Sequence, residues 1–483
     1  MTMLKTISDI RNFFQRYPKP VYFVSATPFN LLGLDEWVRD FTYVNYLDCF
    51  DGAHRSVFVP EEAPHAEFTS IEDINNYLLE HKEVVDLIRK KGKGQAIFLM
   101  FDEETERICQ QLGLEVAFPP AKLRQEVDDK VSTTRIGNRA GVASVPNVLG
   151  KVDSYATLRK LAAPLGEQLV VQTAFGDSGH TTFFIASEDD YRKHAAEIER
   201  EPEVKIMRRI RCRGYAMEAC VTRHGTLVGP LMTELVGFKE LTPYRGGWSG
   251  NELYPGVCTP EVRERARTAT LKFGEELKKM GYRGYFEIDF LVDLDSGDVW
   301  LGEVNPRITG ASLMTNMAAF AWGDLPLFLF HLLEFSGEDF ELDVAALNAR
   351  FADERNIDGW SQLVIKHPDD VVDRITAAPK SGLWQMRGDG SIAHVQPATH
   401  RRAVRSEDEA FFLRISDAGD YRYEGADLGI LLARGRMMDD EFRLTERARR
   451  WIAGVRNHYA GAPLKAPETP AHLPSKMGRF KIL

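Results

Sequence analysis

The stretch 285–312 constrains the fold more than any other part of the chain, because it reads as two apolar strands joined by a polar turn. Side chains on a strand alternate between its two faces. Glu287 and Asp289 therefore share one face of the first strand, and Glu303 and Asn305 share one face of the second. If the strands pair as a hairpin, the carboxylates and the amide come close together.

Two carboxylates and an amide oxygen form a hard-oxygen set that suits Mg²⁺, with Mn²⁺ as the alternative ion. Mg²⁺ normally takes a few protein ligands together with nucleotide phosphates. Arg307, two residues further on, can approach charge that develops on a transferred phosphoryl group. A merely acidic, solvated hairpin is the alternative, but unpaired charge within apolar runs is costly. We predict metal ligands at Asp289, Glu303 and Asn305, and catalytic roles for Glu303 and Arg307.

Other motifs lie upstream in a fixed order. Asp-Asp-Lys-Val-Ser at 128–132 precedes Ala-Gly-Val-Ala-Ser-Val-Pro at 140–146, and the runs 256–263 and 281–284 precede the acidic hairpin. Together with the Glu-x-Asn-x-Arg strand, this order resembles the ATP-grasp superfamily over about 128–335. It is closest in pattern to the branch of biotin carboxylase and carbamoyl-phosphate synthetase.

The resemblance and the strand–helix pattern both indicate an α/β protein of three domains. Apolar strands alternate with helical patterns in the first part of the chain, which predicts a parallel sheet. The expected divisions are an N-terminal pre-ATP-grasp α/β domain at 1–127, a two-lobed ATP-grasp domain at 128–338 with its lid at about 132–210, and a C-terminal α+β cap with a Pro-rich tail at 339–483.

The resemblance also implies a nucleotide site. Family members use two basic residues for phosphates; Lys130 matches the first, but the second position holds Gln172, which brings no charge. Lys205, Arg209 or a loop histidine could supply it. The full set of expected nucleotide-binding residues is Lys130, Gln172, Gly176, Asp177, Ser178, Gly179, His180, Lys205, Met207, Arg208, Arg209, Ile210 and Glu218. Within it, 176–180 form a glycine-rich phosphate loop, 207–210 a hinge for adenine, and Glu218 a group at the ribose or substrate channel.

The substrate side departs from biotin carboxylase. The basic stretch that this enzyme carries after the Glu218 strand is replaced by 231–240, followed by an aromatic, glycine-rich loop at 243–251. Arg245 and Trp248 would suit an organic carboxylate. A structural loop against the third domain is the alternative. Thr309, Ser312 and Asn316 are expected on the amine side.

Composition narrows the class of protein. The chain has 483 residues, 44% hydrophobic content and a net charge of −10 without a basic stripe, which argues against nucleic-acid binding. Five scattered cysteines are typical of reduced thiols. No signal sequence or membrane span is evident, so we expect a cytoplasmic protein. The sequence leaves the oligomeric state open, a homodimer included.

The expected function is an ATP- and Mg²⁺-dependent ligase. It would activate a small-molecule carboxylate as an acyl phosphate and join it to an amine, forming an amide bond and releasing ADP and phosphate. Two alternatives stay open: a carboxylase that activates bicarbonate, and a nucleotide-binding protein without turnover.

Overall fold

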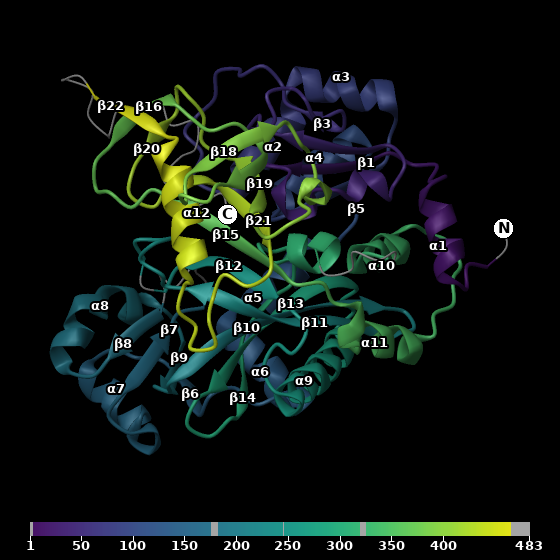
Figure 1. Cartoon of the computed structure of the whole chain (residues 1–483). Helices are drawn as coiled ribbons and strands as arrows, with labels where there is room; N and C mark the ends of the chain where they lie inside the picture. The colour runs from purple at the N-terminus through teal and green to yellow at the C-terminus, as the bar shows by residue number, and fades with distance from the viewer. Residues whose placement is uncertain (1–2, 175–181, 245, 319–324, 465–483) are drawn as a thin grey trace.

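The computed structural model describes residues 3–174, 182–244, 246–318 and 325–464 (Figure 1). Within these residues, no helix is long and apolar enough to cross a membrane. Short 3₁₀ and π segments connect the main elements; they are η1 (Phe29–Leu31), η2 (Leu34–Glu36), η3 (Ala163–Leu165), η4 (Met314–Ala318), η5 (Glu354–Asn356) and η6 (Arg401–Ala403).

The N-terminal part contains the predicted parallel sheet, with strand order β3-β2-β1-β4-β5. Its strands are β1 (Val21–Ser25), β2 (Phe41–Asn45), β3 (Val57–Phe58), β4 (Gln95–Phe98) and β5 (Glu115–Val116), and its helices are α1 (Ile7–Phe14), α2 (Ile71–Glu80), α3 (Lys82–Lys91) and α4 (Glu103–Leu112). Ser70 caps α2 as expected, by accepting a hydrogen bond from the Asp73 N–H.

The lid is a small antiparallel sheet with strand order β6-β9-β7-β8, set to one side of the molecule (Figure 1). Helices α5 (Ala121–Asp128) and α6 (Lys130–Ala140) lead into it, and α6 ends at Gly141 in the left-handed conformation, as the sequence indicated. The lid elements are β6 (Asn147–Gly150), α7 (Tyr155–Leu161), β7 (Leu169–Gln172), β8 (Thr182–Ile185), α8 (Glu188–Arg200) and β9 (Val204–Arg208).

In the described residues the largest sheet has ten antiparallel strands, in the order β14-β13-β10-β11-β12-β15-β21-β19-β17-β18. One half is β10 (Cys212–Thr222), β11 (Gly225–Val236), β12 (Trp248–Leu253), β13 (Gly284–Asp293) and β14 (Val299–Asn305). Helices α9 (Pro260–Lys279), α10 (Leu327–Phe335) and α11 (Val344–Ala352) pack against this half.

The C-terminal part continues the same sheet, because β12 pairs with β15. Its elements are β15 (Trp360–Lys366), β16 (Asp373–Ala377), β17 (Gly382–Met386), β18 (Ile392–Gln396), β19 (Glu409–Arg414), β20 (Tyr421–Arg422), β21 (Asp427–Arg434), α12 (Glu446–Asn457) and β22 (Ala460–Pro463). Strands β20, β16 and β22 form a separate small sheet. The sheet thus runs across the expected boundary at 338/339, and the three-domain division stays a prediction.

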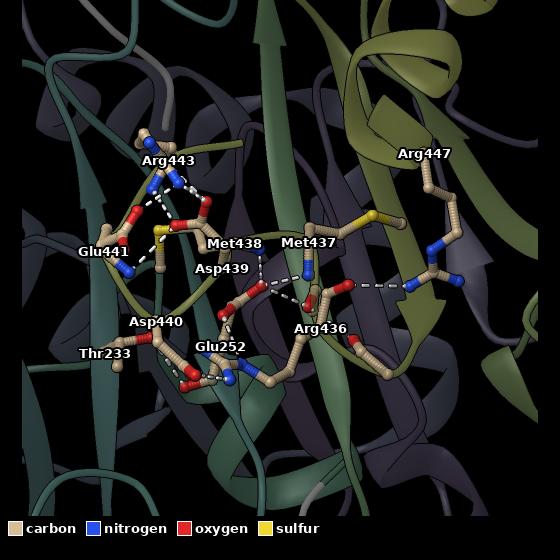
Figure 2. Close-up of polar contacts among 12 residues, drawn as sticks. Thr233, Glu252, Arg436, Met437, Met438, Asp439, Asp440, Glu441, Arg443 and Arg447 are labelled. Atoms are coloured by element: carbon tan, nitrogen blue, oxygen red, sulfur yellow. Dashed lines mark hydrogen bonds and ion pairs between the residues drawn. The ribbon is translucent and has the colours of Figure 1, made fainter. Parts of the chain in front are cut away.

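A strap at 436–443, between β21 and α12, joins the two halves (Figure 2). It crosses to Glu252 of β12, a fully buried carboxylate. Glu252 Oε1 accepts hydrogen bonds from the backbone N–H groups of Met437 and Met438, the latter at 2.8 Å, and from Ser361 Oγ at 2.9 Å. The strap therefore supplies two of the three donors to Oε1, and it places Arg436 Nε 4.0 Å from Oε2, which has no hydrogen-bond partner among the described residues.

Candidate active site

The acidic hairpin forms as predicted. Strands β13 and β14 are antiparallel, with Asp289 opposite Glu303 and Glu287 opposite Asn305. Directly opposed residues project from the same face of a sheet. All four side chains therefore share one face, which we call the acidic face.

Asn305 occupies the centre of this group. Its Nδ2 donates to Glu287 Oε2 at 3.2 Å and to Asp289 Oδ2 at 3.1 Å, while its Oδ1 accepts from Arg307 Nη2 at 2.7 Å. The amide thus presents its nitrogen to the carboxylates. To ligate an ion through Oδ1, it would have to turn over, which would also release the Arg307 nitrogen. Arg307 Nε is buried and has no hydrogen-bond partner among the described residues.

Cations face the acidic hairpin from the start of α6 and from the lid. Lys130 Nζ lies 3.2 Å from Glu303 Oε2. Lys205 of β9 is fully buried, and its Nζ donates to the Gly302 carbonyl at 3.4 Å. Gln172 of β7 lies directly opposite Lys205, and its Oε1 is buried without a partner in the described part of the chain. Lys205 is thus the cation nearest in register to the neutral Gln172.

The electrostatics of the acidic face fit an added cation. Burial raises the pKa of Asp289 well above its usual value, and the charges of Glu287 and Glu303 add to this effect. Burial also acts on Glu303, but the charge and hydrogen bond of Lys130 outweigh it and lower the pKa of that carboxyl. Among the described residues no three His, Cys, Asp or Glu side chains form a ready metal cage. An ion here would need phosphate or water ligands besides Asp289, Glu303 and Asn305.

The expected adenine hinge lines an apolar patch between the lid and the hairpin. Met207 is buried in a small cluster with Val145 and Val170, and Ile210 and Trp300 pack against it. A flat, uncharged base suits such walls. Met207 and Ile210 therefore stay predictions that this setting supports.

Arg208, the last residue of β9, and Arg209, which follows it, are exposed, and their backbone N–H groups already donate to the Pro146 and Gln168 carbonyls. The Arg209 guanidinium lies over the Phe184 ring at 5.4 Å, near the opposite end of β7 from Gln172. Arg209 is thus badly placed to replace the missing phosphate cation. The expected phosphate loop, Gly176, Asp177, Ser178, Gly179 and His180, lies outside the described residues, and so does Arg245.

Glu218 lies opposite Glu287 on the acidic face, and its role at the ribose or substrate channel stays a prediction. Glu218 is fully buried, and it accepts hydrogen bonds from Tyr285 Oη at 2.5 Å, Ser312 Oγ at 2.5 Å and Thr309 Oγ1 at 3.1 Å. Asn316 Nδ2 donates to Tyr285 Oη at 3.0 Å. The residues that we expected on the amine side are therefore buried: Thr309 and Ser312 donate to this carboxylate, which could not lie within the sheet without donors, and Asn316 donates to the Tyr285 hydroxyl.

The aromatic loop contacts the C-terminal part, in agreement with the structural alternative. Tyr244 Oη donates to the Glu424 carbonyl at 3.2 Å, in the C-terminal part. The Trp248 ring packs so closely on Gly310 that a Cβ there would come within 2.2 Å of it. Trp248 is only partly buried, and its ring lies next to Gly310.

The sequence reasoning missed Glu234 of β11. Its carboxylate lies over Gly214 of β10, where an added Cβ would meet Glu234 Oε2 at 2.3 Å. Gly214 is opposite Leu291, two residues from Asp289, so Glu234 lies on the acidic face. Burial, helped by the charges of Asp289 and Glu303, raises its pKa well above the usual value. A lone acid in the apolar run 231–236 was the available signal.

Comparisons with known proteins agree with this geometry. No protein-family model matches the chain. The 2-oxoglutarate carboxylase small subunit of Hydrogenobacter thermophilus is 22% identical over 263 residues, 53% of this chain and 54% of that one. A pyruvate carboxylase component of Methanothermobacter thermautotrophicus is 22% identical over 285 residues, 54% of this chain and 56% of that one. The match spans about half the length of these relatives.

Solved structures are similar over nearly the whole chain. Biotin carboxylase from Campylobacter jejuni has a TM-score of 0.61 and 13% identity, covering 93% of this chain and 94% of that one. The biotin carboxylase domain dimer of the Hydrogenobacter enzyme, with MgADP and bicarbonate, has a TM-score of 0.58, 14% identity, and coverage of 92% and 91%. N5-carboxyaminoimidazole synthetase from Staphylococcus aureus with ADP has a TM-score of 0.52, 11% identity, and coverage of 91% and 97%. The chain therefore has the α/β ATP-grasp fold of these structures, and in sequence it is a distant homologue of the biotin carboxylase-type relatives.

Proposed function

We propose that this protein is an ATP-dependent, ADP-forming ligase that joins a carboxylate to an amine. The observation that carries the proposal is the meeting of opposite charges: Glu303, opposite Asp289, pairs with Lys130, and Lys205 donates to the neighbouring Gly302 carbonyl. Carboxylate oxygens suit Mg²⁺, and ammonium groups suit phosphate oxygens. Mg²⁺, when bound at Asp289, Glu303 and Asn305, would neutralise the phosphates of ATP.

The reaction would proceed in two displacements. A substrate carboxylate oxygen attacks the γ-phosphorus, the bond from that phosphorus to the bridging oxygen breaks, and ADP leaves. The amine nitrogen then attacks the acyl carbon, phosphate leaves, and the amine proton passes to solvent. Arg307 Nε, which has no hydrogen-bond partner among the described residues, would donate to the phosphoryl group during its transfer. Positioning and electrostatics supply most of the rate in such transfers.

Activation of bicarbonate is the second candidate, favoured by the carboxylases among the relatives. Against it, strands β11 and β12 carry no lysine or arginine at 231–236 or 248–253, where an anion would need one. A nucleotide-binding protein without turnover, which Gln172 and Met207 would permit, is the third. A homodimer stays a prediction, as the Hydrogenobacter domain is a dimer.

A screen of organic carboxylates with amines, measured as ADP and phosphate release, tests the proposal. Hydroxylamine should trap the acyl phosphate as a hydroxamate. Bicarbonate and free biotin should not stimulate ATP cleavage. ADP release with bicarbonate alone would establish the carboxylase instead, and formation of AMP and pyrophosphate would contradict attack at the γ-phosphorus.

A further inference from the structure

Glu234 is an acid without a partner on the acidic face. No hydrogen bond or ion pair joins its carboxylate to any described residue, and the side chain stays partly exposed to solvent. Lys130 and Lys205 lie at Glu303 and Gly302 of β14, which is separated from β11 by β13 and β10 in the sheet. A carboxylate that folding leaves uncompensated in this way is costly, so a group from outside the chain is its natural complement.

A second, independent group points to the same kind of ligand. Asn251 of β12 lies opposite Glu234, and Gln362 of β15 lies opposite Asn251, so the three side chains share one face on consecutive strands. Gln362 is fully buried. Its Nε2 donates to the Gly310 carbonyl at 2.9 Å, but its Oε1 has no hydrogen-bond partner among the described residues. A buried carbonyl without a donor costs free energy comparable to a lost hydrogen bond.

The neighbouring polar groups are already occupied. Asn251 Nδ2 donates to the Thr233 carbonyl at 3.3 Å, and Asn251 Oδ1 accepts from Trp248 Nε1 at 3.2 Å. This bond holds the indole ring beside the same row of residues. What remains unused is one carboxylate and one amide carbonyl, both acceptors, next to an aromatic ring. Such a set is complementary to a cation that carries N–H donors.

We propose that Glu234, Gln362 and Trp248 form a subsite for the ammonium group of a primary amine, so that the second substrate of the proposed ligase enters as a cation. The inference rests on the proposed function, since it names the class of amine that the site would take. The absence of lysine and arginine at 231–236 and 248–253 agrees with a cationic ligand rather than an anion such as bicarbonate.

The test is a binding measurement on the full chain in the presence of a non-hydrolysable ATP analogue and Mg²⁺. Methylammonium and ethylenediammonium should raise the melting temperature saturably at pH 7, whereas tetramethylammonium, which has no N–H donors, and sodium at equal ionic strength should not. Glu234→Gln should raise the half-saturating concentration of methylammonium at least tenfold. Native-like affinity of this variant for the ATP analogue would show that it is folded. Glu240→Gln, an acid on the same stretch that pairs with Arg449, is the matched control and should behave as the native protein.

Equal stabilisation of the native protein and Glu234→Gln, or equal effects of methylammonium and sodium, would overturn the proposal. If Glu234→Gln does not fold, Gln362→Met tests the same subsite and should raise the half-saturating concentration at least fivefold; no change would refute it. Because this readout needs no turnover, it is separate from the carboxylate screen. A failed screen would refute the ligase, and a failed titration would refute only the ammonium subsite.

Discussion

Replacing Lys205 by methionine tests where the second phosphate charge comes from. Lys205 is fully buried, and burial, joined by the charge of Lys130, lowers its pKa to about 8. This lowering of the pKa corresponds to about 3 kcal/mol of unfolding free energy. The protein without nucleotide is less stable by this amount because it buries a charged side chain. Lys205→Met should therefore melt at a higher temperature than the native protein in the absence of nucleotide.

The same variant should lose affinity for ATP. A hydrogen bond to a charged group is worth about 1.5–3 kcal/mol, so the Kd for Mg·ATP should rise by roughly 10- to 150-fold in calorimetric titrations. Because Gln172 lies directly opposite Lys205, with Cβ atoms in such pairs about 5 Å apart, adding Gln172→Lys should restore most of the loss. Lys193→Met, at an exposed lysine of α8, is the control. A Lys205→Met protein that binds Mg·ATP within twofold of the native Kd would refute the reasoning.

Two further predictions concern catalysis and acid stability. Glu303→Gln should fold and still lose at least a hundredfold in carboxylate-dependent ADP release, since removal of one charge partner in a transition state costs on the order of 3 kcal/mol; the exposed Glu188→Gln should be unaffected, and near-native release by Glu303→Gln would disprove the assignment. His331 is buried with Nδ1 accepting from the Tyr285 N–H at 3.0 Å, and burial lowers its pKa to about 3. As the pH drops, His331 takes up a proton in the unfolded chain before it does so in the folded protein. The free energy of unfolding should therefore fall between about pH 6.5 and pH 3, by about 2 kcal/mol at pH 5 when measured by urea unfolding. A His331→Gln protein with the same pH dependence would contradict this.

The local features of the chain were predictable from the sequence. The acidic hairpin, the β7–β8 hairpin of the lid and the end of α6 at Gly141 all follow from alternation, turn residues and helix caps, and the structure has them. Strand β2 escaped notice because Thr42 and Asn45 interrupt its apolar pattern. Asn45 Nδ2 donates to the Ser25 carbonyl at 3.1 Å, a bond that only the fold provides.

Side-chain partners across the sheet were not predictable. Glu218 reads in sequence as a charged residue that needs a ligand, yet its donors come from residues more than sixty positions away. Glu234 reads as an ordinary strand residue, and only the pairing of β10 with β13 places it near Asp289. Strand register between distant segments places both acids on the acidic face, with Glu218 opposite Glu287, and a single sequence does not reveal that register.

The pairing of β12 with β15 joins strands that lie more than a hundred residues apart. Contacts of this kind form late during folding, because a long loop must close, at a cost in conformational entropy, before the contacts can stabilise the chain. When a nascent chain has emerged from the ribosome only as far as α10, β12 would be an unpaired edge strand, and Glu252 would lack the hydrogen-bond donors of the strap. Synthesis of this protein should therefore pass through an aggregation-prone stage that ends only when the last strands arrive, which makes it a candidate for chaperone assistance during translation.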